Sequence, residues 1–429
     1  MTLHVESLDA EGRGVARTPE GKVVFVEGAL PGEDVDFQVL KKKLSHEFAR
    51  ATSIQHASSS RVTPRCPHFG VCGGCATQHA DVRTQMAAKQ RWLEENLARI
   101  GKVGAETMLP IVYGQEWGYR NRARLSVRRV PKKGGVLVGF REKRSTYVAD
   151  MRECPVLPPH VSALIPRLKA LIEGLSINER VPQIEVAVGD NATVLVFRHL
   201  LPFTPSDLLS LKNFSEETKA HVWLQPSGPD SAHALEPADS ALYYDLPAFG
   251  VRIAFRPTEF TQVNFAMNRL LVSRAIRLLD PRPGERIADL FCGLGNFSLP
   301  IASRGARVIG FEGSRALVER ARANAAANER VAQFEVADLF KSGISAWGPF
   351  DKLLIDPPRE GAVELVKSLP EGGDAAWPRR IVYVSCDPAT LARDAGVLVH
   401  AKGFRLVAAG VVNMCPHTAH VESMAVFER

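Results

Sequence analysis

Short runs of apolar residues alternate with polar ones over residues 1–58. Residues 23–26 (Val-Val-Phe-Val) and 34–40 (Asp-Val-Asp-Phe-Gln-Val-Leu) are such runs, and a Gly-Ala-Leu-Pro-Gly stretch separates them. Runs of this kind broken by glycine are typical of β-strands joined by tight turns. The spacing predicts an OB-like barrel of about five strands over residues 1–58, a fold that often binds nucleic acid. A purely structural cap is the alternative.

A helical period follows in residues 81–100. Met86, Gln90, Leu93, Leu97 and Ile100 recur at helical spacing, which predicts one buried helix face, and a glycine at position 101 predicts the end of the helix. Residues 59–256 then read as a mixed α+β central domain. Its expected strands lie at 124–128, 136–140, 184–188, 193–197 and 251–255.

From residue 257 to 429 strands and helices alternate. Strands are expected at 286–291, 308–312, 334–336, 352–356 and 381–385, with helices from about 296, over 316–328 and from about 388. Repeated βα units of this length predict a Rossmann-like α/β domain with a parallel sheet covered on both faces.

The composition is that of a globular protein. The chain has 429 residues, of which 45% are apolar and 24% charged. It contains no run of about 18 apolar residues, so no membrane span is expected. The first residues do not resemble a secretory signal, and seven cysteines without one favour a reducing compartment. We therefore expect a cytoplasmic protein.

The net charge of +7 is concentrated in one segment. Residues 117–144 hold ten Lys and Arg residues against one acid, Glu142. Such a basic stripe indicates a partner with a phosphate backbone. The alternative is an ordinary solvated basic hairpin.

Four cysteines in the first 154 residues indicate a metal centre. Cys66, Cys72 and Cys75 are separated by five and two residues, and Cys154 lies far downstream, followed by proline. Close thiols on a glycine-bearing loop plus one distant Cys-Pro are typical of an iron–sulfur cluster. Cys292 and Cys415 have no motif around them, and we assign both to packing.

The first βα turn of the C-terminal domain predicts a nucleotide site. Gly293 and Gly295 follow a strand, and Glu312 ends the next strand 19 residues after Gly293. An acid at about that distance accepts ribose hydroxyl bonds in Rossmann-type sites. With Asp338 after the third strand, and without the third glycine of a dinucleotide fingerprint, the set points to S-adenosylmethionine (SAM). An unoccupied turn is the alternative.

Three further polar residues lie where catalysis is expected. Asp356 ends the fourth strand, in Asp-Pro-Pro-Arg, where its carboxylate can accept an imide N–H such as that of uracil. Cys386 ends another strand just before a helix, where a thiol can become nucleophilic, although many lone cysteines are buried and inert. Glu422 is a candidate general base. His417 and His420 have too few companion ligands to predict a metal pair.

Taken together, these motifs resemble the RNA uracil-C5 methyltransferases over essentially the whole chain. Residues 1–58 are similar to that family's RNA-binding TRAM domain. The resemblance implies a [4Fe–4S] cluster on the four cysteines, Cys386 as the nucleophile and Glu422 as the base. It also implies that six residues contact SAM or line its pocket, namely Gln262, Phe291, Asn296, Glu312, Asp338 and Asp356.

A TRAM domain together with a cluster is most similar to bacterial enzymes acting on 23S ribosomal RNA. The implied partner is therefore 23S rRNA with a flipped or unpaired uridine, and no obligate protein partner is expected. Three alternatives stay open. They are the same chemistry on another rRNA uridine or on tRNA, an iron–sulfur redox or radical-SAM enzyme, and a non-catalytic RNA-binding protein.

Overall fold

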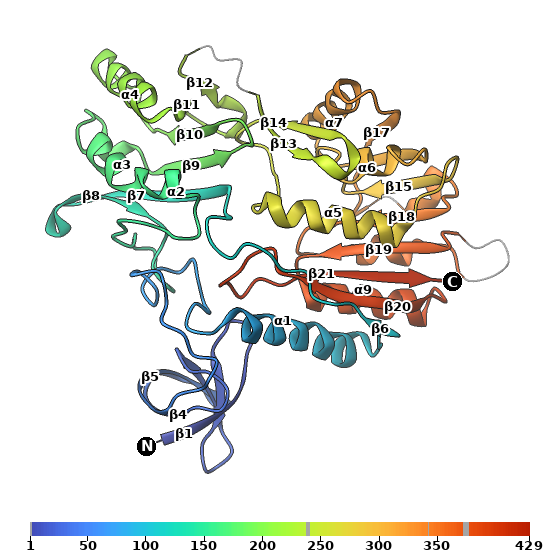
Figure 1. Ribbon diagram of the computed structural model, residues 1–429, viewed down its shortest axis with the longest axis horizontal. Coiled ribbons are helices and arrows are strands. Elements are labelled where there is room, and N and C mark those ends of the chain that lie inside the picture. The colour runs from blue at the N-terminus through green and yellow to red at the C-terminus, as the bar shows by residue number, and fades with distance from the viewer. Residues whose placement is uncertain (1, 237–240, 342, 372–376) are drawn as a thin grey trace.

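The computed structural model describes residues 2–236, 241–341, 343–371 and 377–429 (Figure 1). Five strands close into a barrel in the order β1-β2-β3-β5-β4. Alternate residues point inward, and Val5, Val24 and Val26 are fully buried there. The predicted five-stranded barrel is therefore confirmed. Its strands are β1 Thr2–Leu8, β2 Gly14–Arg17, β3 Val23–Glu27, β4 Asp34–Lys42 and β5 His46–His56.

Helix α1 (Val82–Asn96) follows, capped by Asp81, whose carboxylate accepts the N–H of Thr84 at 2.7 Å. The predicted helix is present, but its buried face differs from the prediction. A π-helical turn (Leu97–Gly101) widens the last part of the helix, and Ile100 is 49% exposed instead of buried. Three polar residues, Gln85, Lys89 and Asn96, are buried on α1 as well.

A six-stranded sheet in the order β12-β11-β10-β9-β7-β8 forms the middle of the molecule. A two-stranded sheet, β13–β14, lies beside it. The strands are β7 Arg122–Val130, β8 Gly135–Gly139, β9 Gln183–Val188, β10 Thr193–Arg198, β11 His221–Gln225, β12 His233–Ala234, β13 Leu242–Leu246 and β14 Val251–Phe255. The helices are α2 Pro159–Ser162, α3 Leu164–Glu173 and α4 Pro205–Thr218.

An eight-stranded sheet in the order β17-β16-β15-β18-β19-β21-β20-β6 forms the C-terminal part. The five predicted strands are parallel, but β21 returns antiparallel between β19 and β20. The predicted parallel strands are therefore confirmed, and the antiparallel β21 is an addition that the sequence analysis did not include. The strands are β6 Thr107–Met108, β15 Arg286–Leu290, β16 Arg307–Glu312, β17 Ala332–Val336, β18 Lys352–Ile355, β19 Arg380–Ser385, β20 Arg405–Val412 and β21 Glu422–Glu428.

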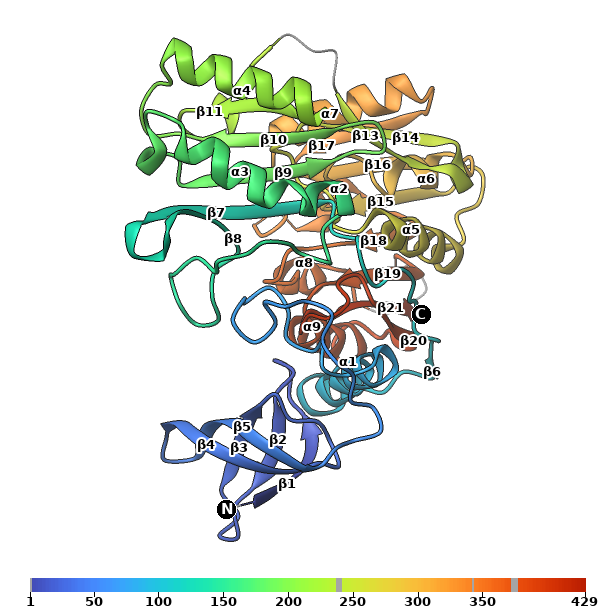
Figure 2. The same cartoon turned by 60° about the vertical axis from the view of Figure 1, so that its left-hand side comes forward.

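Helices cover both faces of this sheet, as expected for an α/β domain (Figures 1 and 2). One core joins α5 (Phe265–Leu279), α6 (Ser298–Ala302) and α7 (Arg315–Ala327) to one face. A second core joins α1, α8 (Val363–Lys367) and α9 (Pro388–His400) to the other. Neighbouring strand residues alternate between the two cores, since Leu354 belongs to the first and Leu353 to the second.

Two segments from early in the chain pack against the C-terminal part. Strand β6 pairs with β20, and α1 packs against α9, although both precede the six-stranded sheet in sequence. The predicted boundaries at residues 58 and 256 stay a prediction. No helix within the described ranges is long and apolar enough to cross a membrane.

Candidate active site

Cys386 and Glu422 lie next to each other at one edge of the eight-stranded sheet. In the β19–β21 ladder Ser385 faces Ser423, and the hydroxyl of Ser423 donates to the Ser385 carbonyl at 3.2 Å. The next residue of each strand beyond this pair is Cys386 on one side and Glu422 on the other. Backbone pairing thus brings the predicted nucleophile and the predicted base together.

Asp356 joins this pair. It follows β18, the parallel neighbour of β19, and its N–H donates to the carbonyl of Leu290 on β15 at 3.2 Å. Burial and the neighbouring carboxylates of Glu422 and Asp289 raise the pKa of Asp356 well above its usual value. Asp356 therefore holds its proton more tightly than an ordinary aspartate.

The same environment disfavours a thiolate at Cys386. Burial, followed by the charges of Glu422 and Asp356, raises the pKa of Cys386 to about 12, and Arg359 acts weakly in the opposite direction. Glu422 is only 3% exposed, and its carboxylate lies 3.7 Å from the imidazole of His420. Cys386, Asp356 and Glu422 therefore form a group of one thiol and two carboxyls, of which Glu422 is buried and the other two are half-buried.

The turn after β15 lies at the same edge of the sheet. Phe291 adopts a left-handed backbone conformation (φ 66°), which is uncommon for a residue other than glycine. The N–H of Gly293 donates to one carboxylate oxygen of Glu312 at 3.2 Å, and the N–H of Ser314 donates to the other at 2.9 Å. Glu312 is thereby fixed beside the glycine turn, with lone pairs left to accept further bonds.

Asn296 is held by residues that the sequence reasoning missed. Its side-chain oxygen accepts bonds from the Tyr244 hydroxyl and the Asn268 amide, both at 2.9 Å, and its own amide donates to Asn268 at 3.0 Å. Asn268 is fully buried on the otherwise apolar face of α5. A buried amide on an apolar helix face was the signal in the sequence that could have identified it.

The remaining predicted cofactor residues are less closely tied together. Asp338 follows β17 and pairs with Lys341 at 3.2 Å. The rings of Phe291 and Phe340 lie 5.6 Å apart, which brings the loop of Asp338 near the glycine turn. Gln262 is half-buried between β14 and α5, two residues before Asn264, the residue that caps α5.

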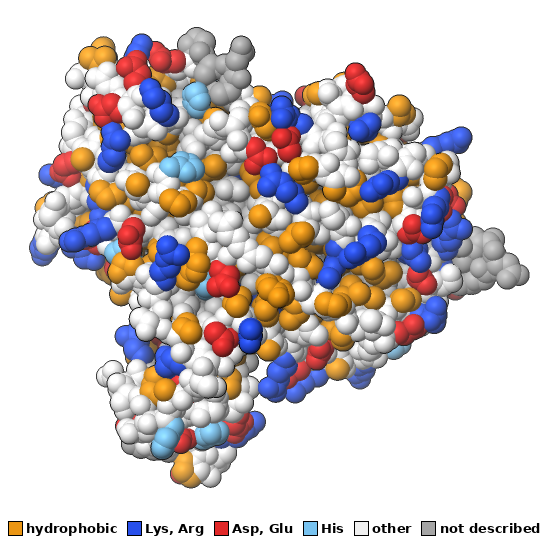
Figure 3. All heavy atoms as spheres, viewed as in Figure 1, with side chains coloured by type: hydrophobic (Ala, Val, Ile, Leu, Met, Phe, Trp, Pro, Cys, Tyr) orange, Lys and Arg blue, Asp and Glu red, His pale blue; other side chains and the backbone are white. Residues whose placement is uncertain are grey.

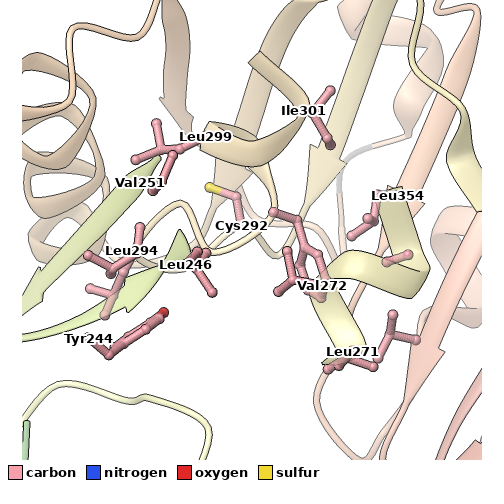
Figure 4. Close-up of a cluster of buried hydrophobic side chains, with 14 of the residues drawn as sticks. Tyr244, Leu246, Val251, Leu271, Val272, Cys292, Leu294, Leu299, Ile301 and Leu354 are labelled. Atoms are coloured by element: carbon pink, nitrogen blue, oxygen red, sulfur yellow. The ribbon is translucent and has the colours of Figure 1, made fainter. Parts of the chain in front are cut away.

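Asp289 is a further buried acid that was not predicted as a site residue. It is fully buried on β15, and the Ser298 hydroxyl donates to one of its oxygens. Burial raises the pKa of Asp289 to about 7. Its neighbour Cys292 lies among apolar side chains, as Figure 4 shows, in agreement with the packing role expected for it.

The four N-terminal cysteines surround one cavity of about 90 Å³. Burial raises the pKa of all four thiols, to about 11 for Cys75 and about 12 for Cys154. Lys143 and Arg120 lie near enough to favour the thiolates of Cys72 and Cys75, respectively. Within the described residues no group of three His, Cys, Asp or Glu side chains is placed to hold a single metal ion.

A larger groove of about 760 Å³ runs between the barrel, the cysteine loop and the β7–β8 hairpin. Five basic side chains line this groove against three acidic ones, and Ala419, three residues before Glu422, lies at its edge. We call it the hairpin groove. Its basic residues are Arg13, Arg124, Arg141, Lys143 and Arg144, and Figure 3 shows Lys and Arg side chains near the hairpin on one face.

Known proteins match this chain along its whole length. A family model described as tRNA (Uracil-5-)-methyltransferase matches residues 85–346, and the TRAM domain model matches residues 1–52. A protein of Aromatoleum aromaticum named 23S rRNA (uracil(1939)-C(5))-methyltransferase RlmD is 59% identical over 431 residues, which cover 99% of each chain. A protein of the same name from Thiobacillus denitrificans is 61% identical over 432 residues, covering 100% of this chain and 99% of that one.

A solved structure has the same fold throughout. It is the Pyrococcus abyssi tRNA (uracil-54, C5)-methyltransferase in complex with S-adenosyl-L-homocysteine, with a TM-score of 0.76, 26% sequence identity and full coverage of both chains. The family model covers more than half of the chain, and the full-length relatives share well over half of its residues. The chain therefore belongs to the RNA uracil-C5 methyltransferase family, and its N-terminal barrel is a TRAM domain.

Proposed function

We propose that this protein methylates C5 of one uridine in 23S ribosomal RNA, using SAM as the methyl donor. The observation that carries the proposal is the position of Cys386 and Glu422, each one residue beyond the paired Ser385 and Ser423 at the end of the β19–β21 ladder. A thiol and a carboxylate fixed side by side are the two groups that covalent catalysis at a uracil ring requires. The names of the full-length relatives support the RNA substrate.

The chemistry divides between these two residues. The thiolate form of Cys386 adds through Sγ to C6 of the uracil, and the electrons of the C5–C6 double bond move toward C5 and O4, which makes C5 nucleophilic. SAM, when bound, would supply the methyl group to C5, with S-adenosylhomocysteine as the leaving group. Glu422 then removes the C5 proton, the C5–C6 double bond re-forms, and the Sγ–C6 bond breaks to release the thiolate. The base must leave its stack to reach both groups, so the target is a flipped or unpaired uridine.

We propose the turn after β15 and its neighbours as the SAM site. Glu312 would accept the ribose hydroxyls, and Asn296 is held in place for contact by Tyr244 and Asn268. Asp356 would contact either SAM or the N3–H of the uracil. Gln262, Phe291 and Asp338 complete the proposed lining.

We further propose a [4Fe–4S] cluster on Cys66, Cys72, Cys75 and Cys154. Four thiols around one enclosed cavity form a suitable set of donors, because each thiolate of such a cluster binds a different iron atom. Ligands of this kind stand farther apart than ligands that share one ion. The nearby Lys143 and Arg120 would partly balance the negative charge of the thiolates.

The hairpin groove is the proposed path of the RNA backbone. Its basic side chains come from the barrel, from β7 and from the loop that follows β8, and Ala419 at its edge is close to Glu422 in sequence. A ribosomal RNA substrate would place the protein's activity in the cytoplasm, and the proposal requires no obligate protein partner.

The test is transfer of a labelled methyl group from SAM to unmodified 23S rRNA, with the modified nucleotide located by nuclease digestion and mass spectrometry. A single 5-methyluridine is expected. Cys386→Ala should abolish transfer while SAM still binds, and Glu422→Gln should accumulate an RNA–protein adduct that survives denaturing electrophoresis. Glu428→Gln, at the other end of β21, is the matched control and should form no such adduct.

Two results would overturn the proposal in different ways. Transfer to tRNA instead of 23S rRNA would leave the chemistry intact and refute the substrate. Full transfer by Cys386→Ala would refute the covalent mechanism.

A further inference from the structure

The loop that leads into Glu422 is irregular and yet buried. Residues 413–421 join β20 to β21 without helix or strand, and most of their side chains are shielded from solvent. A buried loop must find partners for its backbone polar groups outside the usual ladders. We call this segment the base loop, because it places the proposed base at the start of β21.

Two buried polar residues of α1 supply many of these partners. Lys89 Nζ donates to the side-chain oxygen of Asn413 and to the carbonyl of Cys415, both at 2.9 Å. One turn earlier, Gln85 Oε1 accepts the N–H of His417 at 2.9 Å, and Gln85 Nε2 lies 3.2 Å from His417 Nδ1. Gln85 is 2% exposed and Lys89 is 6% exposed.

The cysteine loop and the segment before β7 also contact the base loop. The N–H groups of Ala76 and Thr77, directly after Cys75, both donate to the His417 carbonyl, at 2.8 and 3.0 Å. The Tyr119 hydroxyl donates to the Pro416 carbonyl at 2.9 Å, and the Trp117 ring stacks on His417 at 3.9 Å. Three segments distant in sequence therefore converge on one loop.

A buried lysine in this position is costly for the fold. Its acceptors are an amide oxygen and a peptide oxygen, so no carboxylate among them compensates for the lost hydration of the ammonium group. Burial accordingly lowers the pKa of Lys89 to about 8. An apolar side chain would pack on α1 at lower cost, which indicates that the hydrogen bonds to the base loop have another use.

We propose that Gln85 and Lys89 are positioning residues for Glu422, which hold the base loop so that the carboxylate meets the C5 proton of the methylated uracil adduct. This inference rests on the proposed function. It assigns the α1 residues to one step only. Attack by Cys386 does not use Glu422, whereas removal of the C5 proton and release of Cys386 do.

A displaced base loop should therefore slow product release and leave adduct formation nearly intact. The methylated uracil would stay bonded to Cys386 through C6, with its C5 proton still in place. A residue that merely supports the fold would lower both steps together, because fewer molecules would be active. The ratio of the two rates separates the two roles.

The experiment uses the full-length protein with Lys89→Met and Gln85→Leu, 23S rRNA and SAM with a labelled methyl group. Labelled RNA–protein adduct is followed on denaturing gels, and free methylated RNA is followed in the same samples. We expect release to slow by about 10- to 100-fold, as for a misplaced catalytic group, while adduct formation changes by less than about threefold. Gln90→Leu is the matched control, since Gln90 lies on the same helix and bonds to Glu94.

Tyr119→Phe provides a milder second variant, because it removes only the hydroxyl bond to Pro416. We expect Tyr119→Phe to slow release of the methylated RNA by a smaller factor than the α1 variants do. It tests the proposal even if the α1 variants fail to fold. Equal loss of adduct formation and release, or no change in either rate, would overturn the positioning role. If Glu422→Gln itself traps no adduct, the proposed function fails instead.

Discussion

At the scale of single residues, the thiol of Cys386 is hard to deprotonate. Its pKa of about 12 arises from burial and from the carboxyls of Glu422 and Asp356. Since only the thiolate reacts with alkylating agents, iodoacetamide should modify Cys386 about tenfold faster per pH unit between about pH 7 and 10. Peptide mass spectrometry after timed alkylation of the SAM-free protein measures this rate. A plateau below about pH 9 would contradict the expectation.

The buried acid Asp289 makes a second prediction about pH. Its folded pKa of about 7 exceeds the ordinary value of 3.8, so the folded protein retains a proton that the unfolded chain loses between about pH 4 and 7. The contribution of Asp289 to stability therefore falls as the pH rises through this window. Asp289→Asn should raise the melting temperature relative to the wild type more at about pH 8 than at about pH 5, by roughly 1 °C for each kcal/mol by which the substitution stabilises the fold. An equal difference at both pH values would contradict this account.

At the scale of elements, the strands with β-branched runs could be predicted and the last two could not. β19 reads Arg-Ile-Val-Tyr-Val-Ser, whereas β20 contains Ala-Ala-Gly, which has low strand propensity, and β21 is buried on both faces and shows no alternation. Asp356 and Cys386 could be placed at strand ends because they follow strands of the first kind. The proximity of Cys386 and Glu422 could not be predicted, because it depends on pairing between distant strands.

The β13–β14 hairpin also supports the proposed SAM site, through Tyr244. Tyr244→Phe removes the hydrogen bond from the hydroxyl to Asn296 and leaves the hydrogen bonds between Asn268 and Asn296 in place. Loss of one hydrogen bond should weaken SAM binding by about 2- to 10-fold, measured by titration calorimetry. Tyr243→Phe on the same strand is the control and should bind SAM like the wild type. Equal affinities in the two variants would argue against a role of Tyr244 in the site.

At the scale of the whole molecule, the barrel, the cysteine loop and the β7–β8 hairpin act together through the hairpin groove. The basic stripe was evident in the sequence, but several of its charges are paired in the structure, such as Arg124 with Glu185 and Arg144 with Glu27. Only the folded molecule shows which cations face the groove. Arg141 lines the groove and is exposed, so we expect it to contact the RNA backbone.

Arg141→Ala should weaken binding of a 23S rRNA fragment and make its salt dependence shallower. One lost phosphate contact lowers the slope of log Kd against log salt by about 0.7 to 1. Fluorescence anisotropy at several salt concentrations measures the slope. Arg282→Ala, between α5 and β15, is the control, and the same slope in both variants would exclude Arg141 from the RNA path.

The antiparallel pairing of β19 with β21 has a consequence for how the protein tolerates change. The strand register that brings Cys386 and Glu422 together is set by a ladder of backbone hydrogen bonds. A slip of one residue would turn every side chain of β21 to the opposite face, so intermediate registers do not arise. The sheet therefore fixes which residue of β21 lies opposite each residue of β19. Evolution can exchange core side chains on either strand while the distance between the two reacting groups stays the same.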